Sequence, residues 1–157
     1  MHKEMNRWFI IGVVFAIVAT IVIYVIMPNL PQSVTSLRLG DGVFRAKLAL
    51  NESSRQKGLG GTSNLPEDQA LLMAFTTDDK WGIWMKDMSF PIDIIWLNSS
   101  KKVVYIVKNV SPDDQTKVYE PRTDARYVIE LPAGTVDRKA ISADSLASFS
   151  FDETGVK

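Results

Sequence analysis

Short apolar runs separated by turn residues fill most of the chain, and this pattern predicts a mainly β domain. In Trp81 to Lys86, apolar side chains alternate between the two faces of a strand. Ile92 to Leu97 is almost wholly apolar, as expected of a central strand that is covered on both faces. Between these runs, Asp87 to Pro91 begins with a turn-forming Asp and ends with a Pro that lacks a backbone donor. We therefore expect Ile83 to Leu97 to form the central hairpin of the domain.

The same pattern predicts the other elements. Asn51 is a good N-cap for a short helix that ends at Lys57, and a second short helix is expected over Thr135 to Lys139. The central hairpin and the strand that follows it should form a three-stranded meander. The remaining strands are expected over Leu37 to Leu39, Val43 to Leu50, Leu71 to Phe75, Val103 to Val107, Tyr127 to Leu131 and Ser145 to Phe151.

The N-terminal region has a different pattern, because Trp8 to Met27 contains no charged residue. At about 1.5 Å per residue this run is about 30 Å long, which matches the core of a bilayer. Lys3 and Arg7 precede it and the next cation is Arg38, so we expect the N-terminus in the cytoplasm and the domain outside. A cleaved signal peptide and a buried core helix are the alternatives. The expected organisation is a cytoplasmic segment over residues 1–7, a signal anchor over 8–27, a linker over 28–36 and an extracytoplasmic domain over 37–157.

Composition narrows the possible chemistry. The chain has 18 Lys and Arg, 18 Asp and Glu, no cysteine and a single histidine, His2. A histidine-based triad, a thiolate nucleophile and a His or Cys zinc site are therefore excluded from the expected domain. The balanced charge gives no reason to expect nucleic acid as a partner. No metal or cofactor is expected.

Two carboxylates are the main candidates for chemistry. Asp93 lies inside an apolar strand, so its charge must be paired or hydrogen-bonded, and we expect donors from the Asp87 to Pro91 turn or from Arg55. Glu130 falls on the face of its strand opposite Tyr127, Ile129 and Leu131, which favours a surface pair. Alternatively, Asp87, Asp93 and Glu130 supply an acid and a base of the glycosidase kind.

Three of the four tryptophans lie between Trp81 and Trp96, and core packing is the simplest role for them. The functional alternative is that Trp84, beside Lys86 and Asp87, lines a shallow cleft where a sugar ring or a peptide could stack.

The run WMKDMSFPIDIIWL at Trp84 to Leu97 resembles the signature of domain-of-unknown-function family 192, also called uncharacterised protein family 127. Two further blocks match: Arg55 to Leu59, followed by Leu65 to Asp68, and Tyr127 to Gly134. Asp87 and Met88 stand where the family usually has Asn and Thr. The resemblance implies a compact, mainly β domain similar to a jelly-roll sandwich, and it implies no established activity.

We therefore expect a jelly-roll-like β-sandwich or barrel with one or two short helices, preceded by a single transmembrane helix. The expected function is a membrane-anchored binding or accessory module for an envelope component or a partner protein, because the domain shows no complete catalytic constellation. The alternative is a carboxylate-dependent hydrolase of envelope polymer. The candidate residues for a ligand cleft or a structural motif are Arg55, Trp84, Met85, Lys86, Asp87, Pro91, Asp93 and Glu130.

Overall fold

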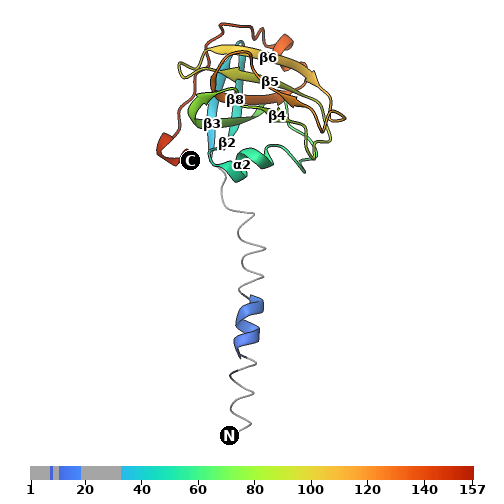
Figure 1. Ribbon diagram of the computed structural model, residues 1–157, viewed down its shortest axis with the longest axis vertical. Coiled ribbons are helices and arrows are strands. Elements are labelled where there is room, and N and C mark those ends of the chain that lie inside the picture. Colours follow the sequence, from blue (N-terminus) through green and yellow to red (C-terminus); the bar gives the residue numbers. More distant parts are fainter. Residues whose placement is uncertain (1–7, 9–10, 19–32) are drawn as a thin grey trace. The chain divides into compact units, whose positions relative to one another are not determined.

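A computed structural model describes residues 8, 11–18 and 33–157 of the chain (Figure 1). The chain divides into two units, Met1–Gln32 and Ser33–Lys157. In the first unit, residues 11–18 are helical. Most of the predicted span from Trp8 to Met27 lies outside the described residues, and within the described part no helix has the length and apolar character needed to cross a bilayer.

The second unit is built on one six-stranded sheet with the strand order β1-β2-β3-β8-β5-β6. All neighbouring strands are antiparallel except β2 and β3, which run parallel. The mainly β class is therefore confirmed. The strands of this sheet are β1 Val34–Leu39, β2 Gly42–Ala49, β3 Gln69–Asp79, β5 Ile92–Leu97, β6 Val103–Val110 and β8 Ala125–Pro132.

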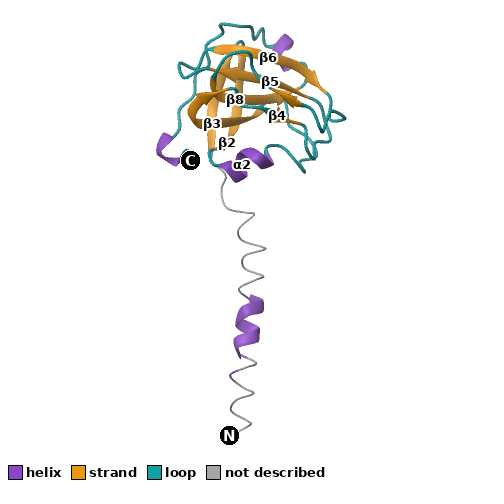
Figure 2. Cartoon of the chain, in the orientation of Figure 1, coloured by secondary structure: helices purple, strands orange, loops and turns teal. Residues whose placement is uncertain are grey.

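Two very short strands, β4 Ile83–Trp84 and β7 Val118–Tyr119, pair with each other as a separate ribbon. Three helical segments complete the unit: α2 Glu52–Lys57, α3 Thr135–Arg138 and the 3-10 helix Glu153–Gly155. Figure 2 shows α2 and the 3-10 helix at one end of the unit and α3 at the opposite end.

The predicted central hairpin is wrong, although its second strand is correct. All six residues of β5 are buried, as expected of a central strand. However, β5 already has β8 on one side and β6 on the other, so neither of its edges is free for β4. A turn in which the Met88 N–H donates to the Met85 carbonyl at 3.2 Å separates β4 from β5, and Asp87 takes a left-handed conformation there (φ 57°). Only β5 and β6 of the predicted meander are paired.

Local sequence signals correctly predicted the first elements of the second unit. The strands expected over Leu37 to Leu39 and Val43 to Leu50 lie within β1 and β2 apart from Leu50, and the two form a hairpin with Leu39 opposite Gly42. Asn51 caps α2 by accepting from the Ser54 N–H at 2.9 Å, and the Ser54 hydroxyl accepts from the Asn51 N–H at 3.1 Å. The helix then leads from β2 to the parallel strand β3, which requires a crossover of this kind.

Each face of the sheet has its own hydrophobic core. Along β8, Tyr127 and Ile129 belong to the first core, which also contains Phe44 and Phe149, while Val128 belongs to the second. The second core contains both Met85 and Trp96 and is covered by the β4–β7 ribbon and the loop after α2. The alternation of β8 is therefore as predicted, but its supposedly outer face is also buried.

The segment after α3 contacts both edges of the sheet without forming a strand. Ser148 exchanges two backbone hydrogen bonds of 2.9 Å with Arg38 of β1, and the Val103 N–H of β6 donates to the Ser145 carbonyl. These isolated bridges fall within the strand predicted over Ser145 to Phe151. The sheet is not a closed barrel, and its single mixed layer with a parallel pair differs from the predicted jelly-roll sandwich, which is antiparallel throughout.

A fragment that starts at Ser33 is expected to fold alone into a β-rich monomer, because both cores consist of residues after this point. Far-ultraviolet circular dichroism and urea unfolding of the purified fragment test this. A mainly helical spectrum, or unfolding without cooperativity, would show that the first unit is needed for the fold.

Candidate functional site

A cavity of about 710 Å³ opens on the side of the sheet that carries the second core. One wall is α2 with the loop to Gly60, and the opposite wall is the ribbon region from Trp81 to Trp84 together with Val118. Side chains of β3 lie between the two walls, and Glu130 reaches the cavity from β8, a central strand. The cavity therefore lies between the loop after α2, the ribbon and the middle of the sheet.

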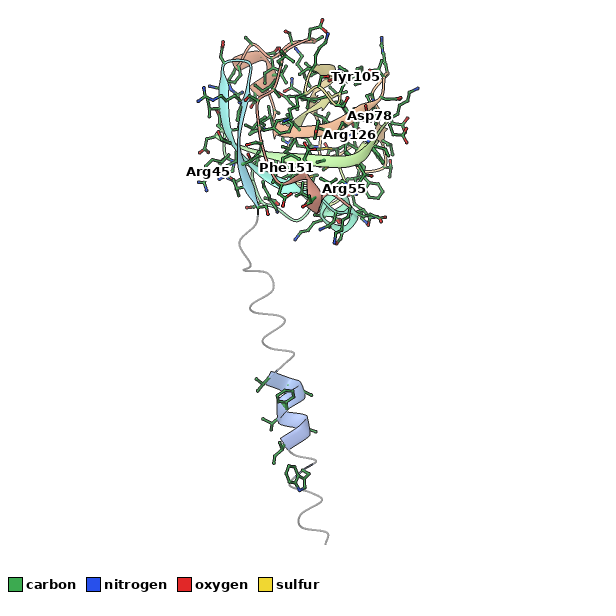
Figure 3. The ribbon with its side chains drawn as sticks, turned by 90° about the vertical axis from the view of Figure 1, so that its left-hand side faces the viewer. Arg45, Arg55, Asp78, Tyr105, Arg126 and Phe151 are labelled. Carbon is green, nitrogen blue, oxygen red and sulfur yellow. The ribbon has the colours of Figure 1, made fainter. Side chains whose placement is uncertain are left out.

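Arg55 connects α2 to the sheet (Figure 3). Its Nη1 donates to the Ala74 carbonyl at 2.9 Å and its Nη2 to the Lys157 carbonyl at 2.6 Å. The guanidinium also lies 4.9 Å from the centre of the Phe75 ring, a cation–π arrangement. Partial burial lowers the pKa of Arg55, which nevertheless stays far above neutrality as an arginine. Arg55 thus fixes one wall of the cavity and keeps a positive charge there.

The loop after α2 depends on glycine. Gly58 ends the helix with φ +50°, a conformation that side chains rarely adopt. A Cβ atom at Gly60 would lie 2.9 Å from the Lys57 carbonyl oxygen and 3.1 Å from that of Lys86. Because only glycine permits this approach, the loop can pass directly against the segment after β4. The Gly61 N–H then donates to the Asp87 carbonyl at 2.9 Å.

Aromatic side chains form part of the cavity lining. Phe75 and Trp81 stack with ring centres 4.1 Å apart and an angle of 9° between the rings. Trp84 is 47% exposed, and the Lys86 ammonium lies 5.6 Å from its ring centre. Trp96 is fully buried and donates to the Trp81 carbonyl at 2.8 Å. The three tryptophans thus divide between the two predicted roles, with Trp96 in the core and Trp81 and Trp84 at the cavity.

Glu130 is the unusual group of the cavity. Its side chain is only 3% exposed, and within the described part of the chain no hydrogen bond reaches its Oε2 atom. Burial raises the pKa of the Glu130 carboxyl from 4.5 to about 8, so it is mostly protonated at neutral pH. The predicted surface pair is therefore wrong, because the second core covers the face of β8 on which Glu130 lies.

Asp93 lies on the opposite face of the sheet. In the register of β5 and β8, Ile94 is opposite Glu130, so the adjacent Asp93 points to the other side. The fully buried carboxylate accepts from the Asn109 N–H and from the Val136 N–H, both at 2.8 Å. Backbone donors do hold Asp93, as expected, but they are not those of the Asp87 to Pro91 turn, and Arg55 is not among them.

Both donors of Asp93 have a structural explanation. The pairing of β5 with β6 shifts between Ile92 and Ile94, where Val110 and Val107 are the partners, so two residues of β6 face Asp93 alone. Such a bulge leaves a backbone N–H without a ladder partner. The second donor lies in the first turn of α3, whose N-cap residue Gly134 offers no side-chain acceptor. The Asp93 carboxylate therefore accepts hydrogen bonds from two backbone N–H groups, one at the bulge of β6 and one in the first turn of α3.

The structure brings together half of the predicted residues. Arg55, Trp84, Lys86 and Glu130 line the cavity. Met85 is part of the second core, and neither Asp87 nor Pro91 lines the cavity. Sequence reasoning did not single out the lining residues Lys57, Leu59, Met73, Phe75 and Met88, and it favoured Trp84 over Trp81. Two of the family-like blocks could have indicated some of them, because Arg55 to Leu59 contains Lys57 and Leu59 and Trp84 to Leu97 contains Met88.

The proposed acid and base pair is not formed by the residues named for it. Asp93 and Glu130 are separated by the sheet, and Asp87 is not among the lining residues. The second carboxyl group that lines the cavity is that of Glu52, which accepts from the Gln56 side chain at 2.9 Å on the surface of α2. The cavity thus combines apolar walls, one buried carboxylic acid and several cations.

Two solved structures share the fold. A Sinorhizobium meliloti protein described as a candidate transcription regulator superposes with a TM-score of 0.73 at 24% identity, over 81% of this chain and 98% of that one. A protein of unknown function from Novosphingobium aromaticivorans gives a TM-score of 0.67 at 21% identity, over 74% of this chain and 84% of the other. Likeness at this level of identity shows the fold alone.

Comparison of sequences identifies relatives in one family. A UPF0127 protein of Thermococcus kodakarensis is 29% identical over 105 residues, which are 67% of this chain and 64% of that protein. A UPF0127 protein of Thermococcus sibiricus is 33% identical over 93 residues, or 59% and 58% of the two chains. The matched part is less than two thirds of the length of either relative. Residues 35–149 match the DUF192 family, described as "Uncharacterized ACR". The chain therefore belongs to the DUF192 family, as the blocks around Arg55, Trp84 and Tyr127 indicated.

Proposed function

We propose that the unit Ser33–Lys157 is a binding module that accepts an apolar or aromatic group in the cavity between α2 and the β4–β7 ribbon. The observation that carries this proposal is the cavity itself, whose volume of about 710 Å³ falls in the range of small-molecule sites. Its walls include the Phe75–Trp81 stack, and the buried Glu130 Oε2 has no hydrogen-bond partner among the described residues. Apolar walls with a few polar groups are typical of ligand sites.

The proposal includes a location. The uncharged run from Trp8 to Met27 would anchor the chain in a membrane with the binding module outside, so the ligand would be an envelope component or part of a partner protein. The support for this part is the sequence of the N-terminal region.

Hydrolysis of an envelope polymer is the alternative, and Glu130 gives it one supporting observation. Its pKa of about 8 would suit a general acid at neutral pH. However, a glycosidase mechanism needs a second carboxylate facing the first. Asp93 lies on the far side of the sheet, and Glu52 accepts from Gln56 on the surface of α2. Binding without catalysis is therefore the better supported function.

Binding of the neutral fluorophore N-phenyl-1-naphthylamine tests the proposal. We expect saturable binding to the fragment that starts at Ser33, because the dye gains fluorescence when it enters an apolar site. Trp84→Ala should weaken the affinity about 2- to 10-fold, as expected for the loss of one aromatic contact. Since Trp84 is half-exposed, the variant should fold normally.

The matched control is Leu146→Ala, which shortens another exposed apolar side chain that does not line the cavity. It should bind the dye like the unmodified domain. The proposal fails if no saturable binding occurs, or if both variants change the affinity equally.

A further inference from the structure

Charge is distributed unevenly around the cavity. The whole chain has equal numbers of acidic and basic residues, yet the lining contains four cations, Arg55, Lys57, Lys86 and Lys157. The carboxyl side chains among the lining residues are those of Glu52 and Glu130, and Glu130 is mostly uncharged at neutral pH. The cavity therefore has a surplus of positive charge that the rest of the domain lacks.

The cations and the buried acid occupy different parts of the cavity. Lys57, Lys86 and Lys157 are exposed, whereas Glu130 is buried. Arg55 is partly buried against the Phe75 ring, so the exposed positive charges at the rim are those of the three lysines.

Within the described part of the chain, the rim lysines are not paired with acidic side chains, although Lys86 lies over the Trp84 ring. The side-chain ion pairs that the structure describes join Lys102 to Asp144, Lys108 to Asp137, Arg126 to Asp78 and Arg138 to Glu67. None of these pairs within the described ranges uses Lys57, Lys86 or Lys157. Figure 3 shows the Arg126 and Asp78 pair on neighbouring strands, which is one such internally neutralised site. Among the described residues, Lys57, Lys86 and Lys157 form no ion pair of this kind.

We propose that the ligand of this cavity is an amphipathic acid, whose apolar ring or chain lies between α2 and the ribbon and whose carboxylate or phosphate is bound by Lys57 and Lys86 at the rim. This inference rests on the proposed binding function and specifies the class of ligand. The apolar part enters first, because the interior offers aromatic walls and an uncharged acid. The acid group of the ligand stays at the mouth, where Lys57 and Lys86 can contact it. There the acid group and the two ammonium groups all remain partly hydrated.

Four naphthalene compounds with different head groups test this: 1-naphthoate, 1-naphthyl phosphate, 1-naphthylmethanol and 1-naphthylmethylammonium. Each is titrated by calorimetry into the full-length chain in a neutral detergent, and the heats of a protein-free titration are subtracted. We expect both acids to bind about 3- to 10-fold more tightly than the alcohol, as two partly exposed charge contacts allow, and the ammonium compound to bind most weakly. The phosphate arm separates the two acid classes, because a phosphate carries up to two charges and should gain more than the carboxylate.

The Lys57→Gln/Lys86→Gln double variant should bind the acids and the alcohol with equal affinity, since both lysines are exposed and their replacement leaves the apolar walls intact. The control pair Lys102→Gln/Lys139→Gln removes the same charge outside the lining and should keep the preference for acids. Equal affinities for all four compounds in the unmodified chain would overturn the inference while leaving the binding function in place. Absence of binding by every compound would overturn both.

Discussion

The Glu130→Gln variant is expected to be more stable than the unmodified domain at pH 9 and equally stable at pH 4.5. The unfolded chain releases the Glu130 proton near pH 4.5, whereas the folded state holds it up to about pH 8. Between these values the folded state binds more protons, so the stability of the unmodified domain falls as the pH rises and reaches its full loss above pH 8. This interval corresponds to a loss on the order of 4 to 5 kcal/mol. The glutamine side chain is neutral at every pH, so the variant does not lose this stability.

Urea unfolding of both proteins at pH 4.5, 7 and 9 measures this effect. Glu120→Gln is the control, because this exposed side chain does not line the cavity, and its pH profile should follow that of the unmodified domain. Identical differences in unfolding free energy at all three pH values would mean that Glu130 is not held neutral in the folded state.

Asp93→Ala is expected to lower the free energy of unfolding at pH 7 by about 3 to 5 kcal/mol, because it removes the acceptor of two backbone donors. The N–H group of Val136 would remain buried without a partner, and that of Asn109 would lose its partner in a partly buried position. Asp93→Asn keeps one oxygen acceptor and should cost about 1 to 3 kcal/mol. Denaturant unfolding of the three proteins gives these differences directly.

Asp137→Ala is the matched control, because this exposed carboxylate on α3 makes a surface pair with Lys108. Its removal should cost less than about 1 kcal/mol. If Asp93→Ala changed stability by no more than this control and instead abolished binding of the naphthyl compounds, Asp93 would be a ligand-binding group and its structural role would be refuted.

The sequence predicted the elements whose pattern is local. The period of two in β8, the apolar run of β5 and the cap at Asn51 each depend on neighbouring residues, and each is present. The pairing of β4 could not be obtained in this way. Its partner β7 lies more than thirty residues further along the chain, and both edges of β5 are occupied by other strands.

Glu130 and Asp93 show why the site was only half predicted. Alternation placed Glu130 correctly on the face opposite Ile129, but it cannot show that a second core covers that face. Similarly, a carboxylate within an apolar strand must find donors, but the donors of Asp93 come from a bulge in β6 and from the start of α3. The left-handed conformation of Asn109 is compatible with its residue type, which is the only local trace of that bulge.

The position of β8 in the sheet has a consequence for synthesis of the chain. β8 is the last strand in sequence, yet it lies in the middle of the sheet between β3 and β5 (Figure 1). While a ribosome makes the chain, the facing edges of β3 and β5 therefore stay unpaired until Ala125–Pro132 emerges. Open apolar edges of this kind can pair with other chains. We therefore expect these two edges to stay exposed until about three quarters of the unit Ser33–Lys157 has been made.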